Sequence, residues 1–408
     1  MHIPSNANAT SPSSQTNHFA FAAMTTLFFL WGFITALNDI LIPHLKAAFS
    51  LSYTQAMLVQ FCFFGAYFVV SPFAGKLIER IGYTNGIITG LCTIATGCLI
   101  FYPASELGFY FVFLLGLFIL ASGVAILQVS ANPYVAILGS EKTAASRLNL
   151  AQGINSLGHT LAPLFGAFLI FGAVHQETSA ESVQLPYFIL AIATLCIAVG
   201  FKFLKLPQIK SHQATQASSE VSLLSQKNLI LGAIGIFLYV GAEVTIGSFL
   251  VNYFSQPDIG NMSEKAASSM VSYYWGGAMI GRFVGAALTR VVKPVYVLVT
   301  NALAAVVLLF TTMNTTGDLA MWSVIGVGFF NSIMFPTIFS LAIKGLGPLT
   351  GRGSGLLCQA IVGGAILPLI QGAVADFTSV QASFIVPVAA YIYIGFYAMY
   401  VKKSESEG

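Results

Sequence analysis

Long apolar runs separated by short polar segments recur along almost the whole chain. Each run holds about 20 residues or more, enough for a helix to cross about 30 Å of hydrocarbon. A membrane helix satisfies its own backbone hydrogen bonds, whereas barrel strands would give alternating runs of about ten residues. The pattern therefore predicts an all-α membrane protein. Its twelve transmembrane helices are expected at residues 19–47, 53–78, 84–104, 108–138, 143–172, 185–204, 228–256, 264–290, 294–313, 318–344, 353–378 and 381–401.

Two polar segments divide this pattern. Residues 1–18 are rich in Ser, Asn and Thr without the basic region of a signal peptide, and predict a disordered tail. Residues 206–227 form a long internal polar run, which we interpret as a cytoplasmic linker between two six-helix bundles, 19–205 and 228–402.

A weak internal repeat supports two pseudo-symmetric bundles around a central cavity. Arg147 in the fifth span and Arg352 in the eleventh each precede a proline by the same number of residues. Asn132-Pro133 in the fourth span is matched by Phe335-Pro336 in the tenth. Matches in the same order in both halves are typical of transporters built from repeats.

Composition agrees with the membrane assignment. The chain is 56% hydrophobic and only 8% charged, whereas soluble domains carry about 25% charged residues. Lys and Arg in short loops stay on the cytoplasmic side, and of the 17 Lys and Arg all but Lys46 and Lys265 fall on the side that holds both termini. Arg282 is counted with this cytoplasmic set. We therefore expect both termini in the cytoplasm of a protein of the bacterial inner membrane. The net charge of +3 reflects this topology, so we expect no nucleic-acid partner.

Only two of the 14 acidic residues, Asp39 and Glu243, fall well inside predicted spans. An acid at the centre of a membrane helix costs about 2.5 to 3.5 kcal/mol, so it indicates function by default. Neither has an intramembrane Lys or Arg within reach in the sequence. Each must therefore be neutralised by a proton, a cation or polar neighbours. Cation coupling is the hypothesis, and an acid that only pins helices together is the alternative.

The fifth span carries Gln152, Asn155, Ser156 and His159 at a spacing that places them on one helix face. Amides donate and accept hydrogen bonds, which suits an uncharged ligand covered in hydroxyls. Bonding between helices is the alternative, and His159 alone indicates only a satisfied polar residue. The sugar-binding candidates, including two aromatic platforms, are Asn38, Asp39, Gln128, Asn149, Gln152, Asn155, Asn252, Gln359, Trp31 and Trp275.

Other functions find less support in the sequence. HExxH, GxSxG and P-loop patterns are missing, and the five cysteines lack metal spacing, so we expect neither an enzyme nor a cofactor. A multidrug or amphiphile exporter on the same fold would favour a greasier cavity. A sensor that binds sugar without moving it also stays open. We expect a monomer whose partners are a small sugar and the lipid bilayer.

Residues 75–82, GKLIERIG, resemble the cytoplasmic loop signature of the major facilitator superfamily, although Tyr83 and Thr84 stand where basic residues are usual. The resemblance implies a conformational latch between the bundles in the outward-facing state. The latch candidates are Gly75, Glu79, Arg80, Arg147, Arg282 and Arg352.

Longer motifs extend the likeness over nearly the whole chain. They are Phe29-Leu30-Trp31-Gly32, Leu37-Asn38-Asp39, Leu41-Ile42-Pro43, Ala131-Asn132-Pro133-Tyr134, Arg147-Leu148-Asn149-Leu150-Ala151-Gln152, Tyr239-Val240-Gly241-Ala242-Glu243, Gly281-Arg282-Phe283 and Pro336-Thr337-Ile338-Phe339-Ser340. At these residues the chain resembles the fucose permease family, and within it the glucose/galactose and N-acetylglucosamine branch. The resemblance implies import of a hexose-type sugar by cation symport, with Asp39 as the first-helix acid and with Gln152 and Asn155 near the sugar.

Two differences from fucose permease leave the identity of the coupling ion undecided. Gln128 replaces a fourth-helix glutamate of fucose permease, and Glu243 stands where that permease has an amide. Gln128 cannot titrate, so Na⁺ competes with H⁺ as the coupling ion. The cation-coupling candidates are Asp39, Glu243, Asn38, Gln128 and Asn132, with Na⁺ expected at Asp39 if sodium drives transport.

Overall fold

The computed structural model describes residues 17–50, 53–169, 183–204, 206–207 and 222–407. Within these ranges every regular element is a helix, which confirms the all-α prediction. The first half contains α1 (His18–Ala48), α2 (Tyr53–Ile81), α3 (Tyr83–Leu107), α4 (Tyr110–Ile137), α5 (Ala144–Leu169) and α6 (Gln184–Phe203). The second half contains α7 (Lys227–Phe254), α8 (Glu264–Val291), α9 (Pro294–Asn314), α10 (Gly317–Asn331), α11 (Met334–Ala342), α12 (Thr350–Gln359), α13 (Gly363–Phe377), α14 (Val380–Ser383) and α15 (Ile385–Glu407).

The tenth, eleventh and twelfth predicted spans are each divided into shorter helices. The break between α10 and α11 has a simple cause in Pro336, which has no N–H to donate to the Ser332 carbonyl four residues earlier. In the eleventh span a 3₁₀ turn, Ala360–Val362, joins α12 to α13.

Ten segments of the described chain are long and apolar enough to cross a membrane. The two long helices outside this group are α5 and α8, which are the more polar ones. They pack against each other between the two halves of the molecule. Polar side chains on these helices can therefore face protein instead of lipid.

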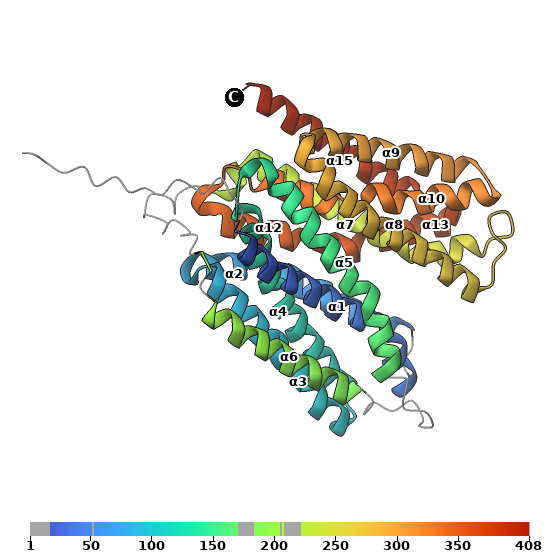
Figure 1. Ribbon diagram of the computed structural model, residues 1–408. Coiled ribbons are helices and arrows are strands. Elements are labelled where there is room, and N and C mark those ends of the chain that lie inside the picture. Colours follow the sequence, from blue (N-terminus) through green and yellow to red (C-terminus); the bar gives the residue numbers. More distant parts are fainter. Residues whose placement is uncertain (1–16, 51–52, 170–182, 205, 208–221, 408) are drawn as a thin grey trace, which may run out of the picture.

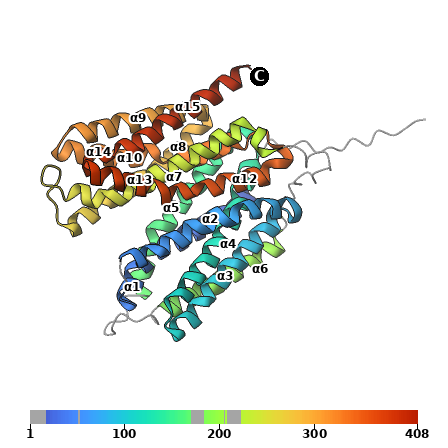
Figure 2. The same cartoon turned by 180° about the vertical axis from the view of Figure 1, so that it is seen from behind.

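The ribbons form two bundles, α1–α6 and α7–α15 (Figures 1 and 2). They converge at the end that holds the start of α5, the end of α8 and the C-terminus, and diverge towards the other end. We call the end where the bundles converge the basic end, and the opposite end the far end. Near the basic end the Ser146 hydroxyl of α5 donates to the Ala286 carbonyl of α8 at 2.6 Å. Further along, Thr160 Oγ1 lies 3.7 Å from Met279 Sδ.

The packing between bundles follows the internal repeat. The second span of each half contacts the fifth span of the other half, α2 with α12 and α5 with α8. Gly75 of α2 allows the first contact, because a methyl group there would lie 2.9 Å from the Gly351 carbonyl oxygen of α12. At the corresponding place on α8, a methyl group at Gly285 would collide with the Ile333 side chain of the same half, whereas Asn149 Oδ1 of α5 would lie at an ordinary contact distance of 3.6 Å.

Candidate functional site

An ion pair lies inside the second bundle. Arg282 Nη2 of α8 is 3.3 Å from Glu243 Oε1 of α7, and the two side chains are only 14% and 12% exposed. Two predictions are therefore wrong, namely that Glu243 has no cationic neighbour and that Arg282 belongs to the charges of the basic end. Arg282 stands nine residues, about two and a half turns, before the end of α8, and antiparallel packing against α7 brings it opposite Glu243.

The Arg282 guanidinium also contacts two other segments. Its Nε donates to the Ser332 carbonyl at 3.4 Å, which is the carbonyl that Pro336 leaves without a helix donor. Its Nη1 donates to the Ser156 hydroxyl of α5, in the other bundle. One arginine thus joins α7, the α10–α11 break and α5.

Buried tyrosines and an amide extend this cluster. The Tyr274 hydroxyl donates to the Glu243 backbone carbonyl at 3.3 Å, and Asn331 Nδ2 lies 2.7 Å from the Tyr274 hydroxyl and 3.4 Å from that of Tyr391. The Tyr239 hydroxyl lies beside the Glu243 carboxylate without a hydrogen bond of ordinary geometry. Asn331 Oδ1 has no partner in the described chain. The sequence showed these residue types inside spans, but not that they meet around one acid.

The polar residues of α5 do not act as a single face. Asn155 Nδ2 donates to the Phe28 carbonyl of α1 at 2.8 Å, whereas Ser156 faces α8. His159 Nδ1 lies 3.2 Å from the Asn155 carbonyl of its own helix. For Asn155 and Ser156 the structure favours the alternative of bonding between helices. The Gln152 side chain is buried next to them.

A second set of amides lies on α4. Gln128 Nε2 donates to the Tyr67 hydroxyl of α2 at 2.6 Å. Asn132 is fully buried, and neither of its amide atoms forms a hydrogen bond of ordinary geometry with a described residue, although the Cys358 thiol of α12 lies beside it. Asn149 of α5 is also fully buried, with its Oδ1 unpaired within the same ranges.

The predicted cation site falls largely outside the described side chains. Asn38 and Asp39 belong to α1, but their side chains lie outside the described residues, so a sodium ion at Asp39 stays a prediction. Among the side chains that are described, no group of three His, Cys, Asp or Glu could hold a metal ion.

The remaining sugar-binding candidates are dispersed. Trp31 is buried, with its ring centroid 4.0 Å from that of Phe28, so it packs within the first bundle. Trp275 is 44% exposed and rests over Gly247, where a methyl group would lie 2.9 Å from its ring. Asn252 is exposed near the far end of α7. Of the two predicted aromatic platforms, Trp275 is the accessible one.

The latch candidates also lie in different parts of the structure. The Arg352 backbone N–H donates to Glu79 Oε1 at 3.3 Å and so joins α12 to α2 near Gly75. Arg147 instead donates from Nε to the Val135 carbonyl at 3.0 Å. Its other contacts, with the Ala136 and Ser140 carbonyls and the Thr143 hydroxyl, also lie within the first half of the chain. Arg80 is exposed at the end of α2.

Sequence reasoning missed an exposed ion pair between the halves. Lys344 Nζ lies 3.8 Å from Glu141 Oε1, and the two side chains are 44% and 66% exposed. Exposed pairs of this kind contribute about 0 to 1 kcal/mol. The contacts of α12 with α2 therefore matter more to this interface than the charge pair does.

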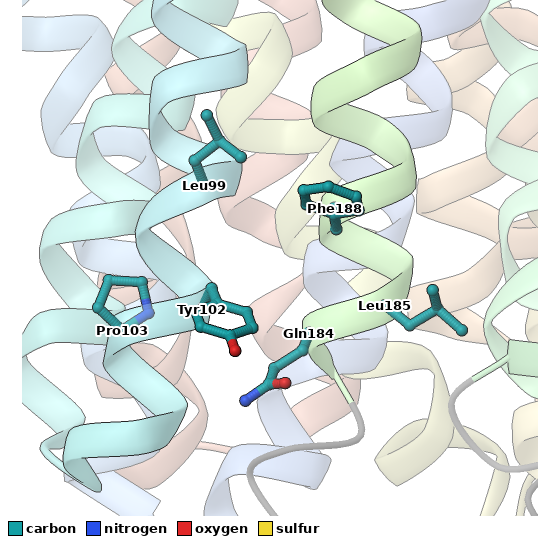
Figure 3. A pocket seen from close by; sticks show the side chains of 6 residues that line it. All are labelled: Leu99, Tyr102, Pro103, Gln184, Leu185 and Phe188. Carbon is teal, nitrogen blue, oxygen red and sulfur yellow. The ribbon is translucent and has the colours of Figure 1, made fainter.

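An apolar pocket of about 490 Å³ lies elsewhere, between α3 and α6 (Figure 3). Its lining residues are Leu99, Tyr102, Pro103, Gln184, Leu185 and Phe188. The lining contains none of the polar side chains described above. We therefore do not regard this pocket as the ligand site.

Comparison with known proteins agrees with this architecture. A model of the Major Facilitator Superfamily matches residues 19–361. The chain is 55% identical over 400 residues to a glucose/galactose transporter of Brucella abortus, which covers 97% of each chain. It is 35% identical over 405 residues to the L-fucose-proton symporter of Escherichia coli, which covers 93% of this chain and 92% of that protein. A crystal structure of the transporter FucP in the outward conformation superimposes with a TM-score of 0.86 at 34% identity, and covers 93% of this chain and 98% of FucP. The chain therefore belongs to the major facilitator superfamily.

Proposed function

We propose that this multi-pass membrane protein imports a hexose-type sugar, of the glucose, galactose, fucose or N-acetylglucosamine class, in symport with H⁺ or Na⁺. The identity of 55% over nearly the full length of a glucose/galactose transporter carries the proposal. It favours a sugar transporter over an enzyme and over an amphiphile exporter on the same fold. We further propose a monomer in a bacterial inner membrane, with twelve spans and both termini in the cytoplasm.

The proposed mechanism is alternating access. The hydrogen bonds from Ser146 to Ala286 and from Arg352 to Glu79 support an interface between the bundles that is closed at the basic end. If the basic end faces the cytoplasm, the bundles diverge towards the outside, where sugar and cation enter. Binding then favours the state in which the bundles rock and release both ligands to the cytoplasm.

We assign coupling to Asp39. Glu243 already has Arg282 as its counter-charge, and a cation beside that guanidinium would be repelled. Gln128 does not titrate, so it can serve only as a neutral ligand. Asn132 stays a separate candidate ligand for Na⁺, because its buried amide oxygen is unpaired within the described chain and oxygen ligands suit Na⁺. A proton on Asp39 is the alternative form of the same proposal.

For the sugar we propose Gln152 and the ring of Trp275. The amide is buried on α5 at the bundle interface, and the indole is accessible on α8. Asn149 lies beside Gly285, ten residues and therefore about 15 Å along α8 from Trp275, so we do not include it in the same site. Amides recognise hydroxyl groups through paired donors and acceptors. An exposed indole can contact the apolar face of a pyranose.

Uptake into proteoliposomes tests the proposal. Labelled glucose, galactose, fucose and N-acetylglucosamine would be offered with a sodium gradient at equal pH, and separately with a pH gradient without sodium. Accumulation of one sugar under one gradient is the expected result and names the coupling ion. Sugar binding without accumulation or counterflow would instead indicate a sensor. Extrusion of amphiphilic dyes without sugar uptake would support the exporter.

A further inference from the structure

Three prolines interrupt the hydrogen bonding of helices that line the bundle interface. Pro72 lies in α2, Pro133 in α4 and Pro336 in α11. Because proline has no N–H, the carbonyl four residues earlier is left without its helix donor. The freed carbonyls are those of Phe68, Val129 and Ser332.

Each of these three carbonyls accepts a hydrogen bond from a side chain of another helix. Ser354 Oγ of α12 donates to the Val129 carbonyl at 2.9 Å. Gln359 Nε2, five residues further on α12, lies 3.2 Å from the Phe68 carbonyl. Both contacts cross from the second bundle to the first. The third acceptor, Ser332, binds Arg282, whose guanidinium also crosses to α5.

We infer that the carbonyls freed by Pro133 and Pro72 are the acceptors through which α12 holds the basic half of the interface closed. Ser354 is the main positioning residue of this closure, and Gln359 is the second. The same contacts must break when the basic end opens. This inference rests on the alternating access of the proposed function, but not on the identity of the sugar or the ion.

The physical reason lies in the cost of an unpaired carbonyl. The Ser354–Val129 contact is buried, and an unpaired carbonyl in a dry interior costs free energy, so a side-chain donor is preferred there while the interface is closed. The Gln359–Phe68 contact is exposed and therefore contributes less. Once the interface opens, water can replace the donor. A carbonyl already bonded within its own helix would gain less from Ser354. The prolines thus make closure depend on α12 without preventing release.

The backbone of α12 fits this role. Gly355 lies so close to α2 that a methyl group there would be 2.6 Å from the Ser71 carbonyl oxygen. Cys358, one turn after Ser354, is fully buried beside Asn132 of α4. Separation of α12 from α4 would therefore expose the Cys358 thiol, which provides a natural reporter of opening at this interface.

The test uses the full chain in liposomes without sugar. N-ethylmaleimide, which crosses membranes, labels the protein for increasing times, and peptide mass spectrometry measures the modified fraction of Cys358. We expect Ser354→Ala to raise the labelling rate about threefold, the effect of a typical hydrogen bond between membrane helices. Pro133→Ala gives the Val129 carbonyl a donor in its own helix, and should raise the rate in the same direction.

The double variant separates this role from general loosening. In the Pro133→Ala background, Ser354→Ala should add little, because the acceptor no longer depends on α12. Ser130→Ala is the matched control, since the Ser130 hydroxyl is buried on α4 but donates to the Ile126 carbonyl of its own helix. It should leave labelling unchanged, and Ser354→Thr, which keeps the donor, should stay near the natural rate.

Two results would overturn the inference. One is an unchanged rate in Ser354→Ala, and the other is a threefold effect of Ser354→Ala that persists in full in the Pro133→Ala background. Failure of sugar uptake would contradict the proposed function but leaves this labelling comparison intact, because no sugar is present.

Discussion

The Glu243–Arg282 pair yields the sharpest prediction about stability. Among the described residues, replacing Glu243 by leucine leaves the Arg282 guanidinium with the Ser332 carbonyl and the Ser156 hydroxyl as hydrogen-bond partners. Both members of the pair are more than four-fifths buried, so water screens the remaining charge poorly. Removing one partner of a buried ion pair costs about 3 to 5 kcal/mol. We expect Glu243→Leu to lose that much free energy of unfolding.

Removing both charges should cost less than removing one. The double variant Glu243→Leu with Arg282→Met loses two further hydrogen bonds, and each contributes about 1.5 to 3 kcal/mol because the guanidinium donor is charged. It also removes the free-energy cost of taking two charges out of water. Replacing a buried ion pair by apolar side chains therefore often leaves protein stability unchanged or raises it. The double variant should therefore be more stable than Glu243→Leu alone.

Reversible unfolding in mixed micelles, followed by circular dichroism, measures these differences. Glu141→Ala is the matched control, because it breaks an exposed ion pair with Lys344 and should change stability by about 1 kcal/mol or less. If Glu243→Leu costs no more than Glu141→Ala, the reasoning about burial is wrong. If the double variant is as unstable as the sum of both single changes, the two side chains do not act as a pair.

Three further predictions follow from single positions. Asp39→Asn should abolish gradient-driven sugar accumulation in proteoliposomes, and unchanged accumulation would remove Asp39 from the mechanism. Gly32→Ala should lower the free energy of unfolding by about 1 to 3 kcal/mol, because the new methyl group would collide with the Asn155 carbonyl oxygen of α5; Gly65→Ala, with no described atom within 4 Å of the added methyl, should not destabilise. Trp275→Ala should weaken sugar binding about three- to tenfold in calorimetry if the indole stacks on the sugar, and unchanged affinity would exclude that role.

Hydrophobic patterning along the chain was enough to predict the class of protein and most of its helices. Apolar runs long enough to cross a bilayer indicate membrane helices, because a helix satisfies its own backbone hydrogen bonds in lipid. The length of such a run can be read directly from the local sequence. The motifs around Asn132-Pro133 and residues 147–152 were sufficient to identify the family. Even α5 and α8 were predicted correctly as helices, although they are too polar to stand out by composition alone.

Which polar side chains meet could be learned only from the packing of the helices. Glu243 and Arg282 are 39 residues apart, Asn155 reaches a carbonyl 127 residues away, and Ser354 reaches one 225 residues away. In a membrane helix, the faces towards lipid and towards protein are both apolar, so periodicity does not reveal the direction in which an amide or arginine points. That direction depends on how neighbouring helices are rotated and how far each is shifted along its axis. For this reason a latch arginine proved to be the partner of a buried acid.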